Sequence, residues 1–204
     1  MASAAHSASE QTPATTSSSP KLPTFLMGVG LGGFVDGILL HQILQWHHFL
    51  TGNNGGEPMT TVAGLEANTL ADGLFHIVSW VFVAIAMLLV VRAWQRRELA
   101  PPWRGHVGML LAGWGGFNLV EGLVNHHILG IHHLRDDLGA PLGWDLAFLA
   151  SGAILIAIGF ALARSGGQVA RQSAPGAQSR PARAEGPPGT TRHRGYADGR
   201  SADS

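Results

Sequence analysis

The chain has 204 residues, of which 46% are hydrophobic and only 13% are charged. Its 13 Lys and Arg residues balance 13 Asp and Glu residues, so net charge gives no sign of a nucleic-acid or acidic partner. The absence of cysteine excludes disulfides, thiolate metal sites and cysteine-held iron–sulfur clusters. The unusual features that remain are 11 histidines, and six tryptophans against one tyrosine.

Four apolar stretches follow an N-terminal segment, residues 1–21, that we expect to be a disordered tail. This segment is rich in Ser, Ala and Thr and lacks the charged start and apolar core of a signal peptide. Each apolar stretch is near the roughly 20 residues that a helix needs to cross a bilayer. Neither the alternation of a membrane barrel nor the polar stripe of a soluble bundle is present, so the sequence predicts an all-α fold, an integral membrane four-helix bundle within residues 22–165. The predicted spans are residues 25–45, 72–91, 108–129 and 142–163.

The cationic residues predict how these spans are oriented. Twelve of the 13 Lys and Arg residues precede the first span, lie between the second and third, or follow the fourth, and Arg135 is the exception. The positive-inside rule then places both termini in the cytoplasm and the other two loops outside. We expect a multi-pass protein of the bacterial inner membrane, with the lipid bilayer as its partner. Residues 166–204, rich in Arg, Pro and Gly, are expected to form a disordered C-terminal tail.

A motif in the first span recurs in the third. Residues 36–48 read DGILLHQILQWHH, and residues 121–133, which lie 85 positions later, read EGLVNHHILGIHH. Acid, glycine, histidine and a histidine pair match without gaps. The second and fourth spans match more weakly, through Asp72 and Phe75 against Asp145 and Phe148. We therefore predict two tandem parallel helical hairpins, residues 22–94 and 104–165, related by an axis along the membrane normal.

Three segments carry a resemblance to a known family: GGFVDGILLHQILQWHH, LEANTLADGLFHIVSW and GWGGFNLVEGLVNHHILGIHHLRDD. Over about residues 22–165 the sequence resembles the bacterial membrane proteins catalogued as domain of unknown function 2243. The resemblance implies a four-helix inner-membrane protein and supplies no activity. It also implies a link to respiratory oxidase assembly, because relatives accompany cytochrome oxidase assembly proteins, and this would favour haem or copper.

The predicted orientation places eight of the 11 histidines, with several acids, in the outer half of the membrane domain. A charged side chain at the centre of a membrane helix costs about 2.5–3.5 kcal/mol, so we expect Asp36 and Glu121 to be paired, hydrated or metal-bound. Glycines near both residues permit the close helix approach that a shared site needs. The candidate metal ligands are Asp36, His41, His47, His48, Asp72, His76, Glu121, His126, His127, His132 and His133.

Helical geometry divides these candidates into layers. Asp36 and His47 are 11 residues apart and share a helix face, and a continuous helix would carry His47 and His48 to the outer surface. Donors seven residues apart are too distant to bind one ion together, so ligands should come from different helices. The expected inner ligands, which would also bind a cofactor, are His41, His76, His126 and His127.

Three classes of function remain open. Imidazole with carboxylate suits a transition metal such as iron, copper or zinc, and facing histidines would suit haem. Alternatively, intramembrane acids and histidines could serve proton or cation transport, for which four short spans would require a homo-oligomer. The third class is a structural or assembly subunit with an inert polar core. The spacings match neither the histidine boxes of membrane desaturases nor the Glu-x-x-His of di-iron bundles, so the sequence leaves open whether the protein is an enzyme.

Overall fold

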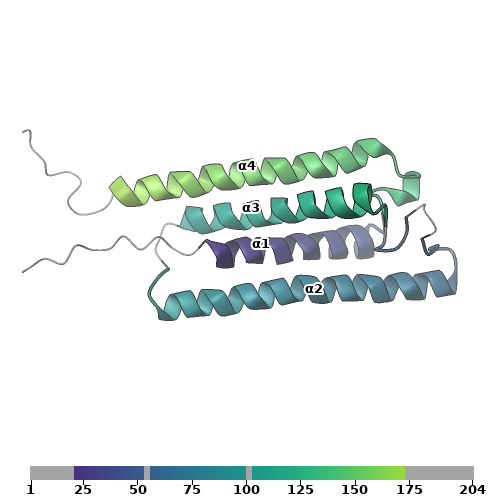
Figure 1. Ribbon diagram of the computed structural model, residues 1–204, viewed down its shortest axis with the longest axis horizontal. Coiled ribbons are helices and arrows are strands. Elements are labelled where there is room, and N and C mark those ends of the chain that lie inside the picture. Colours follow the sequence, from purple (N-terminus) through teal and green to yellow (C-terminus); the bar gives the residue numbers. More distant parts are fainter. Residues whose placement is uncertain (1–20, 53–55, 100–102, 173–204) are drawn as a thin grey trace, which may run out of the picture.

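A computed structural model describes residues 21–52, 56–99 and 103–172, and within them every regular element is helical (Figure 1). Four α-helices, α1 to α4, are joined by two π-helical segments, η1 and η2, and one short 3-10 turn, η3. The four helical segments are long and apolar enough to cross a membrane, which confirms the predicted all-α fold with four spans. The elements are α1 (Leu22–Val35), η1 (Asp36–Ile43), α2 (Val62–Gln95), α3 (Trp103–Glu121), η2 (Gly122–Ile128), η3 (Asp136–Leu138) and α4 (Leu142–Gln172).

Most helix ends differ from the predicted span ends, by one to ten residues. Helix α2 begins at Val62, well before residue 72, because Thr61 caps it by accepting a hydrogen bond from the backbone N–H of Gly64 (3.1 Å). The first span ends at Ile43, before residue 45, and α4 continues to Gln172, past the predicted boundary at residue 165. The predicted disordered tails otherwise fall on residues 1–20 and 173–204, which lie outside the described part of the chain.

The four helices lie side by side in one row, in the order α2, α1, α3, α4 (Figure 1). Helices α1 and α3 run in the same direction and pack against each other in the middle, while α2 packs on α1 and α4 packs on α3. Among the described residues, the backbones of α2 and α4 make no contact with each other. The protein is therefore a row of two helical hairpins that meet through α1 and α3.

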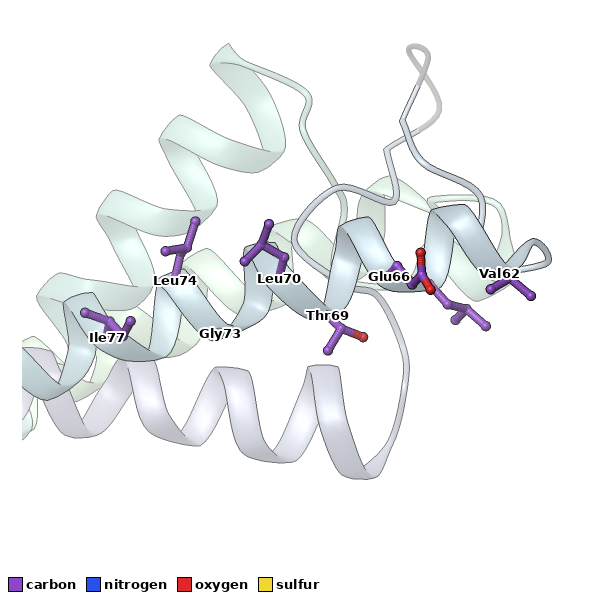
Figure 2. A pocket seen from close by; sticks show the side chains of 8 residues that line it. Val62, Glu66, Thr69, Leu70, Gly73, Leu74 and Ile77 are labelled. Atoms are coloured by element: carbon purple, nitrogen blue, oxygen red, sulfur yellow. The ribbon is translucent and has the colours of Figure 1, made fainter.

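The edge helices expose large apolar side chains, as expected for surfaces that face lipid. Leu88 of α2 is 69% exposed and Ile154 of α4 is 58% exposed. On the exposed face of α2, Gly73 leaves a groove whose walls are mostly apolar, with Leu70 and Leu74 beside it (Figure 2). Its lining is apolar apart from Glu66 and Thr69, which suits the acyl chains of lipids.

Glycines bring α1 and α3 into backbone contact. A Cβ atom on Gly28 would collide with the carbonyl group of Leu110, and one on Gly113 would collide with the carbonyl group of Phe25. Each residue of the first contact has its partner 85 positions away in the second, so the two contacts are equivalent. Small residues at helix crossings permit this close approach in membranes. As a result, η1 and η2 follow at the same end of the row.

After each central helix, the helical turns become wider and the chain then turns back. Segments η1 and η2 are π-helical, and each ends in a wide-turn hydrogen bond of 2.8 Å, Leu44 N–H to Leu39 O and Leu129 N–H to Val124 O. The next residue in each copy has a positive φ angle, 50° at Gln45 and 59° at Gly130. This left-handed turn directs the following histidines back toward the helix ends.

Candidate metal centre

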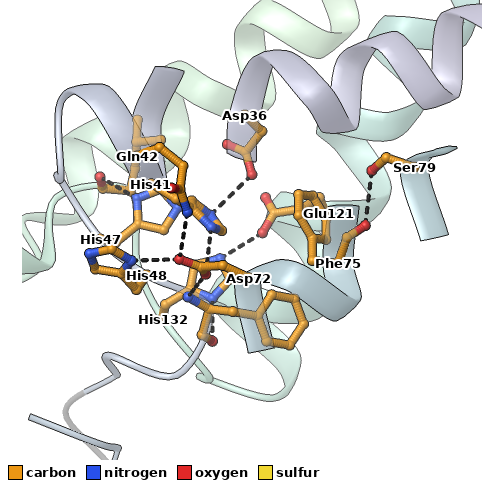
Figure 3. Close-up of polar contacts among 12 residues, drawn as sticks. Asp36, His41, Gln42, His47, His48, Asp72, Phe75, Ser79, Glu121 and His132 are labelled. Carbon is orange, nitrogen blue, oxygen red and sulfur yellow. Dashed lines mark hydrogen bonds and ion pairs between the residues drawn. The ribbon is translucent and has the colours of Figure 1, made fainter. Parts of the chain in front are cut away.

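Four imidazole rings meet at the end of the row opposite to Leu22, two from each hairpin, and all are almost fully buried. His41 lies in η1 and His126 in η2, whereas His47 and His132 lie in the turns that follow. The ring centroids are 4.5 Å apart for His41 and His47, and 5.0 Å apart for His126 and His132. His47 stacks on His132 at 4.7 Å, where the two hairpins meet. Figure 3 shows three of these rings with the acids around them.

The hydrogen bonds of two rings fix which nitrogen carries the proton. His47 Nδ1 lies 3.1 Å from the carbonyl oxygen of Leu134, and His132 Nδ1 lies 3.0 Å from that of Phe49. A carbonyl oxygen can only accept, so both Nδ1 atoms must donate. The Nε2 atom of His47 has no hydrogen-bond partner among the described residues, and the Nε2 atom of His132 faces Glu121. Burial also lowers the pKa of His47 well below its usual value, which keeps the ring neutral.

The other two rings are held from the edge helices. His41 Nδ1 bonds to Asp72 Oδ1 of α2 at 2.9 Å, and His126 Nδ1 lies 3.0 Å from Asp145 Oδ1 of α4. A carboxylate on Nδ1 orients an imidazole and makes its Nε2 a better metal ligand. The four Nε2 atoms are thus the ones available for a ligand.

The same two carboxylates also anchor the turns that follow η1 and η2. Asp72 accepts hydrogen bonds from His48 Nδ1 (2.6 Å) and from the backbone N–H of Phe49 (2.9 Å). Asp145 makes the matching contacts with the residues that follow His48 and Phe49 by 85 positions. These are His133, through Nδ1 (2.7 Å), and Leu134, through its backbone N–H (2.8 Å). Each acid therefore ties an edge helix to the turn that carries the buried histidine.

Two further carboxylates face the Nε2 atoms from the central helices. Glu121 places Oε1 2.8 Å from His132 Nε2 and Oε2 3.2 Å from His126 Nε2. Asp36 is shorter by one methylene group and places Oδ2 3.4 Å from His41 Nε2. We call these six side chains the central cluster: Asp36, His41, His47, Glu121, His126 and His132.

Several buried atoms of the central cluster lack a hydrogen-bond partner among the described residues. They include the Nε2 atoms of His41, His47 and His126 and both carboxylate oxygens of Asp36. Buried polar atoms are nearly always paired in proteins, and an unpaired one costs about 1–3 kcal/mol. Ligand atoms in two sets of three side chains lie within 4.8 Å of one another, which is compatible with a metal ion. These sets are His41, His47 and His132, and Glu121, His126 and His132.

The turns that follow η1 and η2 close over the central cluster. The backbone N–H of Gly52 donates to Ile131 O (2.7 Å), and that of Asp137 donates to Trp46 O (3.2 Å), so each hairpin bonds to the turn of the other. The guanidinium group of Arg135 lies 4.4 Å above the ring of Trp46 and makes two 2.8 Å contacts with Asp137. These contacts hold the pKa of Asp137 below its usual value. These contacts cover the cluster at this end of the row.

The structure brings together most of the candidate ligands but not all of them. His48, Asp72 and His133 lie next to the central cluster and support it. His76 lies apart, with its ring stacked on Phe34 at 6.0 Å, and it belongs to neither candidate metal set. His127 is exposed. The candidate ligands predicted from the sequence did not include Asp145. Its weak match to Asp72 was the signal that could have found it.

The expectation that His47 and His48 lie at the outer surface is wrong, because both are buried. It rested on a continuous helix through residue 45, but the helical segment ends at Ile43 and the chain then turns back. His47 is consequently 0% exposed and lies next to His41. For the same reason, the 11 residues between Asp36 and His47 are not three turns of one helix.

The fold and the site together define a four-span membrane protein with a buried cluster of histidines and acids where its hairpins meet. Residues 23–166 match the family model described as predicted membrane protein (DUF2243), so the chain belongs to this family. This agrees with the resemblance seen in the sequence, and the family description names no activity. Comparison with curated proteins and with solved structures gave no match.

Proposed function

We propose that this protein binds transition-metal ions in the central cluster. The observation that supports this most strongly is the orientation of His47 and His132. Their Nδ1 atoms donate to carbonyl oxygens, so their Nε2 atoms are the ones left for a ligand in a buried region that also holds two carboxylates. Neutral imidazoles with one nitrogen fixed are the usual ligands of such ions, and mixed imidazole and carboxylate donors suit iron, copper, zinc or manganese.

A metal ion fits this arrangement better than haem does. Haem held by His41 and His126 would need a wide, flat space between the two rings. His47 and His132 instead contact both of them, with centroid distances from 4.5 to 6.1 Å, and stack on each other. The space between the expected axial ligands is therefore filled by imidazole.

The proposal includes the location and the ancestry of the site. We place the protein in the bacterial inner membrane with both termini cytoplasmic, which puts the central cluster in the outer half. We also propose that the two hairpins are copies of one ancestral hairpin. Equivalent contacts at an offset of 85 support this: the glycine crossings, the π-helical segments and the hydrogen bonds of the turns.

Metal content of the purified protein tests the proposal. The full chain would be purified in detergent from cells grown with iron, copper, zinc and manganese, and measured by elemental analysis and by an absorption spectrum. We expect the wild type to carry a stoichiometric metal and His41→Ala combined with His126→Ala to lose it. His127→Ala changes the exposed neighbour of His126 and should keep the metal. Wild-type protein that holds neither metal nor haem would instead indicate an inert polar core.

A further inference from the structure

The central cluster consists of two matching half-sites. In each half, a carboxylate comes from the end of a central helix, one imidazole from the π-helical segment and a second from the turn that follows. The first half-site is Asp36, His41 and His47, and the second is Glu121, His126 and His132. Building on the proposed metal binding, we infer that the centre is dinuclear, with one ion in each half-site and the tighter site at Glu121.

The distances among the donors argue for two ions rather than one. The ligand atoms of one metal ion at about 2.0–2.2 Å lie within roughly 4.4 Å of one another. Among the described residues, only sets of three of these side chains come within 4.8 Å, and no set contains all six. His132 belongs to both sets, but its Nδ1 is engaged with Phe49 O, so its Nε2 can serve one ion. Its 2.8 Å contact with Glu121 assigns it to the second half-site. His41 and His47 remain for the first half-site, where Asp36 lies 3.4 Å from His41 but does not complete a set of three within 4.8 Å, so it must move to join an ion there.

The acids around the cluster favour cations as its occupants. Four carboxylates in and around the cluster are 5% exposed or less, and among the described residues their ion-pair contacts are with histidines and not with Lys or Arg. Buried charges are costly unless they are compensated, so bound cations would stabilise these acids. The four acids are Asp36, Asp72, Glu121 and Asp145.

One methylene group makes the half-sites unequal. Glu121 reaches both of its histidines, at 2.8 and 3.2 Å. Asp36 reaches only His41, at 3.4 Å, and His47 Nε2 has no hydrogen-bond partner. A carboxylate that already lies between both imidazoles is better preorganised for an ion, since fewer groups must move on binding. The Glu121 half-site should therefore fill first.

Zinc titration of metal-free protein tests this inference. The full chain in detergent would be stripped with a chelator and titrated with Zn²⁺ against a chromophoric competitor. We expect two ions per chain with different affinities, and one ion per chain after Asp36→Asn. Asp36→Glu restores the missing methylene group and should strengthen the weaker site at least about 10-fold. His127→Ala should still bind two ions.

A second readout reports on the distance between the ions. Loaded with Mn²⁺, the wild type should give the electron paramagnetic resonance spectrum of an exchange-coupled pair, and His47→Ala should give that of an isolated ion. His47 lies in a turn, so this variant serves if Asp36→Asn does not fold. Saturation at one ion per chain would overturn the dinuclear centre and leave metal binding intact. No binding of Zn²⁺ or Mn²⁺ by folded wild type would overturn both.

Discussion

The carboxylate of Asp72 accepts hydrogen bonds from donors in two different segments. His41 of η1, His48 of the turn and the backbone N–H of Phe49 all lie within 2.6 to 2.9 Å of its oxygens. An amide in place of the carboxylate would keep one acceptor and turn an NH₂ group toward another donor. Asp72 therefore positions the proposed ligand His41 and the turn that carries His47.

We expect Asp72→Asn to weaken metal binding about 10–100-fold, because losing such an orienting carboxylate has this effect in other metal sites. Competition with a chelator in detergent measures the affinity, and circular dichroism checks that the helices remain. Glu66→Gln changes an exposed acid on the same helix and should leave the affinity unchanged. A folded Asp72→Asn protein with wild-type affinity would show that Asp72 does not orient the ligand.

Asn68 fixes the long loop of the first hairpin. Its Oδ1 accepts from the backbone N–H of Leu50 (2.9 Å), and its Nδ2 donates to the carbonyl oxygens of Glu57 and Gly64 (3.0 Å each). Asn68→Ala would remove the partner of these backbone groups and three hydrogen bonds of a buried side chain, so we expect a loss of about 1–3 kcal/mol in unfolding free energy. A lower Tm in detergent measures it. Thr69→Ala, at an exposed neighbour, should leave the Tm within a degree or two of wild type, and equal Tm values for both variants would contradict this role.

At the scale of single residues, the sequence predicted which kinds of side chain form the cluster better than which individual residues belong to it. The match between residues 36–48 and 121–133 singled out the acids and the four buried histidines. It could not separate His126 from His127, or show that His76 lies apart. A π-helix adds residues to each turn, so a helical period of 3.6 loses the phase beyond Asp36 and Glu121.

At the scale of elements, the crossing of α1 and α3 sets the distance between the half-sites. Gly28→Ala places a Cβ against the carbonyl group of Leu110, so the helices must move apart. We expect a cost of about 1–3 kcal/mol in unfolding free energy, typical of overpacking, together with weaker metal binding. Thermal unfolding in detergent and Zn²⁺ titration measure the two effects.

Gly73→Ala is the matched control, since nothing lies within 4 Å of a Cβ at this exposed position of α2. Alanine is the better helix former by about 0.5–1 kcal/mol, so this change should stabilise the protein slightly. The two substitutions are chemically identical and have opposite expected signs. A Gly28→Ala protein as stable as Gly73→Ala would show that the backbone contact is unimportant.

Hydropathy predicted the number of spans, because helices are the natural way for these apolar stretches to cross a bilayer. It could not predict that the helices form a row, since surfaces that face lipid and surfaces that face another helix are both apolar. The glycines of α1 and α3 were the available signal. Gly28 and Gly113 mark the central crossing, Gly30 and Gly115 contact the edge helices, and Gly73 on α2 faces open space.

For the whole molecule, the first and last residues of the membrane domain lie at the opposite end of the row from the central cluster. Leu22 and Gln172 are at one end of the row, and the turns that cover the histidines are at the other (Figure 1). The side of the membrane that holds the cluster therefore depends on where the termini are. Twelve of the 13 cations lie in the segments at the terminal end, and the positive-inside rule assigns that end to the cytoplasm.

Single cysteines test this orientation cleanly, because the natural chain has none. We expect a membrane-impermeant maleimide to label Leu138→Cys on intact cells, since Leu138 is 55% exposed in the loop before α4. Ser204→Cys, at the C-terminal residue, should be labelled only after the cells are permeabilised. The reverse pattern would place the central cluster on the cytoplasmic side, where it would draw on the ions of the cytoplasm. Labelling as expected places the cluster in the outer half of the membrane, where ions would reach it from outside the cytoplasm.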